Sequence, residues 1–532
     1  MSAESQCAPS AQAWRSALGL LLLILIAPLL LVDVPPLVDY PNHLARMFVL
    51  AHPQDPGLSR MYVAHWDLLP NLAIDLLVPA LMRVMPVYWA GKLMLASCIL
   101  LPVTGAIAYS RALFGVRSYW QILAGLAAYN GLLLMGFMNF EFAVGAALWL
   151  AAGWVRFRPA FPRSTVIGVA VLAVPLFFFH IFGLLFLSLL LASHEAFYVR
   201  SELQHGPAAS AILHAGLRLA AVFAVPSILL LSAPFTGTAG QASWLGVRDK
   251  AVGIFTPFFN YVPALDFVTG LCVLGVVGSC LLSPRSRVSP PTLLCLAAIA
   301  AAYAAAPFSV KDGEFIDSRF PVMAGFLLFA GFIPGFAGRW TTRAVFALLA
   351  TLFLVRMAVL DVTWARSTDD ASLLRQAIAP VRPGQRVLAV DVTTQDNPQY
   401  WRRIPLSRHI THLASSYWHL PALLVIEQKA FWQGEFALPS QQPWRVQPAY
   451  RDASAPAGRV TSYRDLESKG ISADTLREMP FLADWRGTFD YVLVENAGGL
   501  PDPGRFLPDD LELLVRNDMA ALYRIRKHSV AR

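Results

Sequence analysis

The chain has 532 residues, of which 56% are hydrophobic and only 14% charged, and its formal net charge is +8. Soluble domains are about 25% charged, and apolar stretches long enough to cross a bilayer recur along the first two thirds of this sequence. The composition excludes collagen-like, disordered and small disulfide-stabilised proteins. It predicts an α-helical polytopic membrane protein.

The positive net charge is better explained by membrane topology than by nucleic-acid binding. Most Arg residues before the tail stand in short clusters between apolar segments, as the positive-inside rule describes for cytoplasmic loops. We therefore expect no nucleic-acid partner.

The first apolar stretch covers residues 16–32 and directly follows Arg15. Asp33-Val34-Pro35-Pro36 comes next, instead of a small-residue cleavage site. We interpret the stretch as an uncleaved signal anchor with a cytoplasmic N-terminus. Residues 33–85 then form an outer loop, in which residues 71–83 are expected to form an amphipathic interfacial helix.

Ten further spans bring the expected number of transmembrane helices to about eleven. They cover residues 86–110, 118–135, 139–156, 165–181, 183–199, 211–231, 262–282, 290–307, 321–338 and 342–361. With strict alternation, the Arg clusters between spans fall on the same side as Arg15. Segments 165–181 and 183–199 have almost no loop between them, and a single long helix there would invert the topology downstream.

An odd number of spans places residues 362–532 outside the cytoplasm. This tail is charged and rich in Pro, with strands expected at 386–392, 489–494 and 521–525 and a helix at 367–379. We expect a membrane module over residues 1–361 and a C-terminal extracytoplasmic α/β domain over residues 362–532.

The sequence has no P-loop, no GxGxxG after a strand, no HExxH and no GxSxG. Polar residues at the outer ends of apolar helices are the candidates that remain. Asp39 and His43 are spaced i and i+4, so they share a face of any helix that begins there. Asp39 could act as a base, or it could cap that helix by accepting backbone N–H bonds.

A second group lies at the outer ends of later spans. Asn139 and Glu141 stand in the turn 136–142, where a carboxylate among Phe and Met side chains is costly and needs a partner. His180 lies between two spans, and a lone His on an apolar helix is more often a packing residue than a functional one.

Cations also occur on the outer side, against the topological bias. Arg248 lies in loop 232–261, and Lys311 and Arg319 precede a late helix. Arg319 could bind a phosphate with two parallel hydrogen bonds. The alternative is a surface ion pair with Asp317 or Glu314.

Histidines gather in two places, either of which could bind zinc. These are His43, His52 and His65 in the first outer loop, and His409, His412 and His419 in the tail. Neither set has a tight metal-binding spacing, so solvated loop histidines are the simpler explanation. We assign no metal ligands; a divalent metal is possible but not implied.

The arrangement resembles the GT-C superfamily of membrane glycosyltransferases, which includes protein O-mannosyltransferases and lipid A aminoarabinose transferases. The resemblance rests on Asp39 after the first helix, Glu141 in a short outer turn and Arg319 opening a late helix. Ser110-Arg111-Ala112-Leu113-Phe114-Gly115 at the end of the second span and the outward α/β domain also contribute.

The resemblance implies inverting transfer of a sugar from a polyprenyl-phosphate donor to a hydroxyl of a glycan, lipid or protein acceptor. It places the reaction on the outer face of the membrane, and the Ala/Arg/Pro-rich composition suggests a bacterial inner membrane. A transporter or flippase of a lipid-linked saccharide, or a non-catalytic GT-C-like scaffold, is the alternative.

The resemblance also implies roles for the candidate residues. Asp39 would be the catalytic base, and Tyr40 stands where metal-dependent relatives have a second acidic residue. The other implied catalytic residues are His43 and Glu141. The implied donor-phosphate ligands are Arg319, Lys311 and Arg248, and the implied substrate-orienting residues are Asn42, Asn139 and His180.

Overall fold

The computed structural model describes residues 9–203, 207–233, 242–310, 313–393, 397–410, 414–466, 471–500 and 511–526. The chain forms two compact units. The helical unit comprises Met1–Leu30, Leu68–Ile74 and Leu93–Asp361, and the mixed unit comprises Leu31–Asp67, Asp75–Lys92 and Val362–Arg532. Most of the outer loop expected at residues 33–85 therefore folds with the tail.

Eight helices among the described residues are long and apolar enough to cross a membrane. They are α1 (Ala11–Leu31), α5 (Val87–Phe114), α8 (Met138–Phe157), α9 (Pro162–Phe179), α10 (Ile181–Glu202), α11 (Ala208–Ser232), α13 (Pro263–Leu282) and α16 (Arg339–Ile378). Two shorter apolar helices are α14 (Pro290–Ala305) and α15 (Arg319–Ala330). The polytopic helical class is confirmed, while the number of eleven spans stays a prediction.

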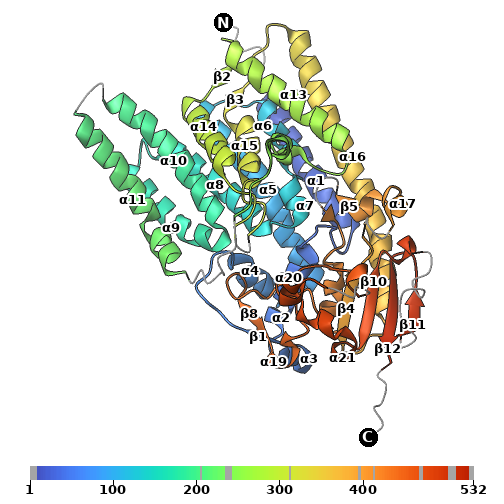
Figure 1. The fold of residues 1–532 in the computed structure, drawn as a ribbon. Coiled ribbons are helices and arrows are strands. Elements are labelled where there is room, and N and C mark those ends of the chain that lie inside the picture. Colours follow the sequence, from blue (N-terminus) through green and yellow to red (C-terminus); the bar gives the residue numbers. More distant parts are fainter. Residues whose placement is uncertain are drawn as a thin grey trace. The chain divides into compact units, whose positions relative to one another are not determined.

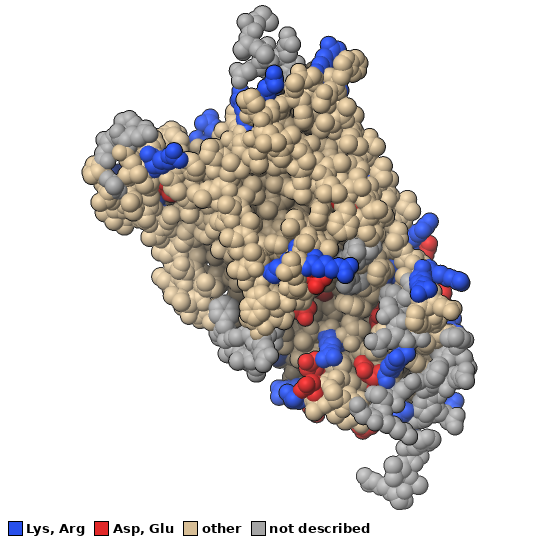
Figure 2. Space-filling view, turned by 45° about the horizontal axis from the view of Figure 1, so that its top comes forward, with Lys and Arg blue, Asp and Glu red and all other residues tan. Residues whose placement is uncertain are grey.

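The sides of these helices are apolar, as a lipid environment requires. Helices α8, α9, α10 and α11 pack side by side in the helical unit (Figure 1). Figure 2 shows a broad surface without Lys, Arg, Asp or Glu over the sides of helices.

The expected span at 118–135 is not one continuous helix. It consists of α6 (Tyr119–Ile122), the 3₁₀ helix η2 (Leu123–Ala127) and α7 (Gly131–Met135). The Asn130 side chain caps α7 by accepting the N–H groups of Leu132 and Leu133. The uniform apolar composition gave no sign of this break, although an Asn-Gly pair at a helix start is a capping signal.

This broken segment nevertheless runs along α1. The Trp14 indole donates to the Ser118 carbonyl at 3.2 Å, and the Tyr129 hydroxyl donates to the Leu25 carbonyl at 2.7 Å. Such side-chain bonds help to satisfy backbone groups where a helix is interrupted inside a membrane protein.

The closely spaced segments at 165–181 and 183–199 are separate helices, α9 and α10. His180 lies between them in an extended conformation, and its Nδ1 accepts the Phe182 N–H at 3.0 Å. The expected span at 342–361 and the expected helix at 367–379, by contrast, are parts of one 40-residue helix, α16.

The mixed unit contains a six-stranded sheet in the order β11-β12-β10-β4-β7, with β9 also pairing with β4. The expected strands appear as β4 (Arg386–Asp391), β10 (Tyr491–Glu495) and β12 (Ala520–Ile525). β4 runs parallel to β10, β7 (Phe431–Trp432) and β9 (Thr461–Ser462), while β12 is antiparallel to β10 and β11 (Leu511–Arg516). The central strands lie next to one another in Figure 1.

Most of the segment expected to form the first outer loop, residues 33–85, belongs to this unit. It contains α2 (Tyr40–Ala51), α3 (Pro56–Met61), β1 (Tyr62–Ala64) and α4 (Ala73–Leu81). β1 pairs antiparallel with β8 (Trp444–Val446), and the Tyr62 ring stacks on Trp444 with 4.4 Å between centroids. The Lys429 ammonium adds an ion pair with Asp55 at 2.6 Å.

The remaining elements are short. They are α12 (Val247–Gly253), η3 (Thr256–Phe258), β2 (Arg287–Val288), β3 (Phe332–Ile333), α17 (Pro398–Trp401), η4 (Leu406–Arg408), β5 (His409–Ile410), β6 (Ala414–Ser415), η5 (Leu420–Ala422), α18 (Leu423–Glu427), α19 (Pro448–Arg451), η6 (Tyr463–Leu466), α20 (Ala473–Glu478), η7 (Pro480–Ala483), α21 (Trp485–Thr488) and η8 (Ala497–Gly499).

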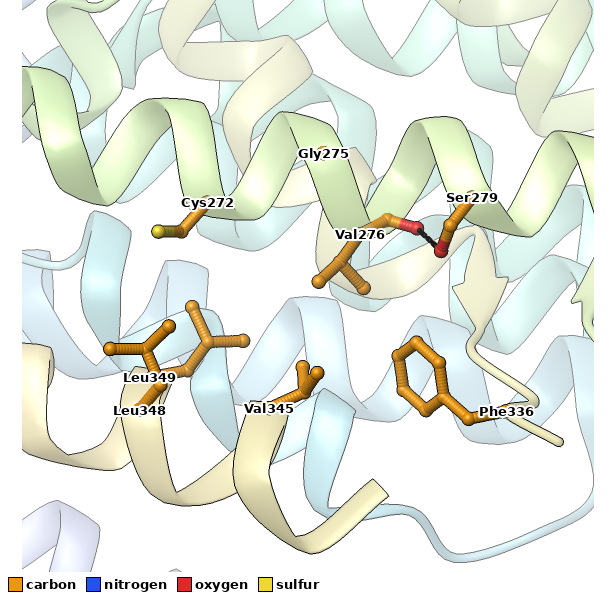
Figure 3. Close-up of a pocket in the computed structure, with 8 residues that line it drawn as sticks. All are labelled: Cys272, Gly275, Val276, Ser279, Phe336, Val345, Leu348 and Leu349. Atoms are coloured by element: carbon orange, nitrogen blue, oxygen red, sulfur yellow. Dashed lines mark hydrogen bonds between the residues drawn. The ribbon is translucent and has the colours of Figure 1, made fainter. Parts of the chain in front are cut away.

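An apolar pocket of about 260 Å³ lies between α13 and α16 in the helical unit (Figure 3). Its lining comprises Cys272, Gly275, Val276, Ser279, Phe336, Val345, Leu348 and Leu349. The Ser279 hydroxyl donates to the Val276 carbonyl at 2.6 Å, so it is already used within its own helix. The pocket offers no acid or base and is not a candidate for the chemistry.

Candidate active site

Asp39 stands at the N-terminal boundary of α2 without capping it. Its backbone is in the right-handed helical region (φ −90°, ψ −10°), and its side chain makes no capping hydrogen bond. Capping residues usually adopt extended backbone angles and accept the N–H of the second or third helical residue. Here the second helical residue is Pro41, which has no N–H. The capping alternative is therefore not realised, and the carboxylate is available for another role.

The partner of Asp39 is His419, not His43. His419 Nδ1 lies 2.9 Å from Asp39 Oδ1, and the side chains are 6% and 18% exposed, respectively. The His43 ring instead faces Arg46, whose guanidinium donates to His43 Nδ1 at 3.0 Å. Loss of hydration, Arg46 and His419 all lower the pKa of His43 well below its usual value, so this ring is neutral at pH 7.

Arg46 is itself held by Asp75 of α4. Its Nε donates to Asp75 Oδ1 at 2.8 Å, and both side chains are buried. Burial raises the pKa of Asp75, while the Arg46 charge and hydrogen bond oppose that rise. This pair joins α2 to α4 beside the candidate base.

A second carboxyl group, Glu435, comes from the tail. Glu435 is 1% exposed, and neither carboxyl oxygen has a hydrogen-bond partner among the described residues. Burial raises its pKa well above the usual range, and the charge of Arg46 only partly opposes this. Burial therefore favours the neutral, protonated form of Glu435.

Asn42 fastens α2 to the segment that carries Glu435. Its Nδ2 donates to the Gly434 carbonyl at 2.8 Å, and its Oδ1 accepts the Phe436 N–H at 2.9 Å. The side chain is fully buried. Asn42, expected as a substrate-orienting residue, thus uses its amide on the backbone of its own unit.

Arg319 is the first residue of α15, in the helical unit. Its guanidinium lies over the rings of Phe137 and Phe182, at 5.1 and 5.0 Å from their centroids. Nη1 donates to the Glu314 carbonyl at 3.0 Å, whereas the buried Nε has no hydrogen-bond partner among the described residues.

The surface ion pair considered for Arg319 is not formed. Asp317 pairs instead with Lys250 of α12, whose ammonium lies 3.4 Å from Asp317 Oδ2. That ammonium also donates to the carbonyls of Tyr303 and Ala306, both at 2.8 Å. Arg319 therefore keeps a buried donor that a charged ligand could use.

The other candidates of the helical unit lie around the same turn. The His180 ring lies 5.6 Å from Phe140 and 5.7 Å from Phe182, which also contacts Arg319. Asn139 Nδ2 donates to the Asn71 carbonyl at 3.0 Å.

Glu141 is buried in the first turn of α8. It is 1% exposed, and neither carboxyl oxygen has a hydrogen-bond partner within the described ranges. The nearby Asn130 amide interacts with it electrostatically. The sequence predicted a partner for this costly carboxylate, and Asn130 is the group that approaches it.

The other two expected phosphate ligands are Lys311 and Arg248. Lys311 lies outside the described residues. Arg248 is exposed on α12, and Lys250 is the residue of that helix that faces Asp317. Lys250 was foreseeable as one of the few cations on the outer side.

The histidine sets do not form a metal site in the described part of the chain. No group of three or more His, Cys, Asp or Glu side chains there is close enough to hold an ion. His412 lies outside the described residues. His419, one of the tail histidines, is the partner of Asp39.

Comparison with known proteins gives matches in structure only. No protein-family model and no curated protein matches the sequence. ArnT from Cupriavidus metallidurans, in a crystal structure bound to undecaprenyl phosphate, aligns with a TM-score of 0.53 at 12% identity, covering 97% of this chain and 98% of that one. The chain has the fold of ArnT. This likeness confirms the expected fold class, a polytopic helical module with a C-terminal α/β domain.

Two further structures were matched. ArnT from the same organism in the apo state gives a TM-score of 0.53 at 11% identity, again over 97% of this chain and 98% of that one. The arabinofuranosyltransferase AftD from Mycobacteria gives a TM-score of 0.40 at 15% identity, over 98% of this chain and 42% of that one.

Proposed function

We propose that the protein is an inverting membrane glycosyltransferase. It takes a sugar from a polyprenyl-phosphate donor and attaches it to an acceptor hydroxyl. The observation that carries this proposal is Asp39, a partly exposed carboxylate at a helix start that it does not cap. The shared fold with ArnT, a protein crystallised with undecaprenyl phosphate, supports a polyprenyl lipid as partner.

In this proposal Asp39 is the general base. The acceptor hydroxyl oxygen forms a bond to the anomeric carbon while the bond from that carbon to the phosphate oxygen breaks. The bonding pair leaves with the polyprenyl phosphate, and Asp39 takes the hydroxyl proton. A base placed within hydrogen-bond reach of the attacking hydroxyl accelerates such a step about 10²- to 10⁴-fold.

Arg319 is proposed to bind the donor phosphate. A buried guanidinium with an unpaired Nε–H is a strong donor for an anion. The guanidinium lies over the rings of Phe137 and Phe182, and these contacts fix its orientation. Charge on the departing phosphate is best stabilised by donors that are already oriented in this way.

Further residues are assigned supporting roles. Glu141, Asn139 and His180 would orient the donor or acceptor, since they lie buried or half-buried near the outer turn. His43 is neutral and would offer a hydrogen bond to a sugar hydroxyl rather than a charge.

The proposed topology has a cytoplasmic N-terminus and a periplasmic tail in a bacterial inner membrane. Contacts between helix ends support it. The Arg111 guanidinium lies 5.2 Å from the Trp14 ring, near the start of α1, and Arg158 and Arg218 both pair with Glu195. These arginines, all expected on the cytoplasmic side, thus contact residues of α1 or α10 that the same topology places on that side.

The test is an assay on purified protein in lipid nanodiscs with a panel of radiolabelled polyprenyl-phosphate sugars. Sugar transfer to an added acceptor, or slow sugar release to water, is the expected result. Vesicles with the same protein and donor report translocation in parallel. Translocation without transfer would show a flippase, and donor binding without either would show a scaffold.

A further inference from the structure

His419 and Asp39 are far apart in the sequence but belong to the same compact unit. Asp39 follows the first membrane helix, and His419 immediately precedes η5 in the tail. The 2.9 Å between His419 Nδ1 and Asp39 Oδ1 is the contact that needs an explanation.

Contacts with Gly458, Phe436 and Trp432 fix the orientation of the His419 ring, and its Nδ1 faces Asp39. Nε2 lies 3.0 Å from the Gly458 carbonyl, which only accepts, so Nε2 carries a proton and donates it there. The rings of Phe436 and Trp432 pack edge-on at 4.9 and 5.9 Å. Gly458 has a φ of +74°, and a Cβ there would lie 2.2 Å from the Phe436 ring.

This tautomer determines what lies between the two residues. With Nε2–H donated to Gly458, an unprotonated Nδ1 would present a lone pair to a carboxylate oxygen at 2.9 Å, which is repulsive. The contact is attractive as an ion pair, in which Nδ1 carries a proton as well. Its geometry is not that of a hydrogen bond, since Nδ1 has no hydrogen-bond partner among the described residues.

We propose that His419 is a positioning residue for Asp39. It holds Oδ1 and thereby leaves Oδ2 as the atom that takes the proton of the acceptor hydroxyl. Among the described residues the Asp39 carboxylate makes no capping hydrogen bond, and its ion-pair contact with His419 is through Oδ1. This inference rests on the proposed function, and it makes the tail a working part of the site rather than an attached domain.

The other charged or titratable groups nearby do not replace His419. The His43 ring accepts from Arg46, and Arg46 is paired with Asp75. Glu435 is a buried carboxyl group whose pKa burial raises, which favours its neutral form. A base oriented by a third group is the usual arrangement in enzymes that abstract a proton from a hydroxyl.

The first test follows the ring of His419 by NMR in full-length protein labelled with ¹⁵N-histidine, with its signals assigned by their loss in His419→Gln. We expect the ¹⁵N chemical shift of His419 Nδ1 to differ between the wild type and Asp39→Asn, because the carboxylate that faces Nδ1 at 2.9 Å is then replaced. Identical Nδ1 shifts in both proteins would overturn the inference. This readout does not depend on transfer, so it stands even if no sugar donor is turned over.

The second test is kinetic and separates positioning from folding. His419→Gln should lower kcat about 10- to 100-fold while the donor KM changes less than about twofold. In the Asp39→Asn background the same substitution should cause no further loss. His65→Gln, at a histidine whose side chain is 57% exposed, is the matched control.

The outcomes of the kinetic test separate two failures. Suppose that the wild type transfers sugar. If His419→Gln then keeps the wild-type kcat, or lowers kcat by the same factor in the Asp39→Asn background as in the wild type, the role of His419 is refuted and the proposed function stands. If the wild type transfers no sugar from any donor, the proposed function fails, and the NMR comparison alone decides whether the pair exists.

Discussion

Asn42 and Phe436 are joined by a half-buried hydrogen bond from the Phe436 N–H to Asn42 Oδ1 at 2.9 Å. The same amide donates to the Gly434 carbonyl. One side chain in the first outer segment therefore satisfies two backbone groups of the tail. These bonds hold the chain on both sides of Glu435 next to α2, which begins directly after Asp39.

Asn42→Ala should destabilise the protein by about 2 to 4 kcal/mol, because it leaves one half-buried N–H and one buried carbonyl unpaired. The midpoint of thermal unfolding in detergent or nanodiscs should fall accordingly. Gln447→Ala is a matched control, since Gln447 also joins these segments through Ser59 but at an exposed position. Its cost should stay below about 0.5 kcal/mol. Equal shifts for the two variants would contradict the role given to Asn42.

Arg319→Gln should weaken binding of a radiolabelled polyprenyl phosphate about 10- to 100-fold, because a charge-assisted hydrogen bond contributes about 1.5–3 kcal/mol. Arg319→Lys should bind with intermediate affinity, since it keeps the charge but loses the planar fork. Arg343→Gln, at an exposed arginine near Trp340, should bind like the wild type. Unchanged affinity in Arg319→Gln would remove Arg319 from the donor site.

Glu435 should make the stability of the protein depend on pH. Its pKa is raised by burial, so the stability it contributes is fully present below the pKa of the unfolded chain and is lost as the pH rises through the folded value. Glu435→Gln should therefore unfold at a higher temperature than the wild type at pH 8, with a smaller difference at pH 5.

The control for this prediction is Glu478→Gln, since Glu478 is half exposed and pairs with Arg459 at the surface. It should leave the pH dependence of the unfolding midpoint unchanged. If the unfolding midpoint of Glu435→Gln depends on pH between 5 and 8 in the same way as that of the wild type, burial does not raise the pKa of Glu435.

The membrane helices and the central strands could be predicted from the sequence because their signals are local. Apolar length marks α5 or α13, and a short apolar run marks β10. The break at Asn130 was missed because hydropathy does not register a cap inside an apolar stretch. α16 was divided because the charged residues after position 361 were taken as the end of a helix rather than its continuation.

The candidate site was only partly predictable for a different reason. Asp39, Glu141 and Arg319 are polar residues beside apolar helices, and this alone marks them. His419 and Glu435 lie in the tail, and they join α2 through the β1–β8 pairing and the Asn42 hydrogen bonds. No local pattern encodes such long-range contacts. The spacing of Asp39 and His43 suggested the wrong histidine as the partner of Asp39, because the guanidinium of Arg46 donates a hydrogen bond to His43.

The central claim is that Asp39 is the base of a glycosyl transfer, and Asp39→Asn tests it most directly. The variant keeps the size of the side chain, and Asp67→Asn serves as control, because Asp67 is a more exposed carboxylate of the same segment, paired with Arg445. Both proteins are compared with the wild type in nanodiscs for donor binding and for sugar transfer. We predict that Asp39→Asn binds the donor normally and loses transfer about 10²- to 10⁴-fold, with Asp67→Asn unaffected. Full transfer by Asp39→Asn would contradict the account.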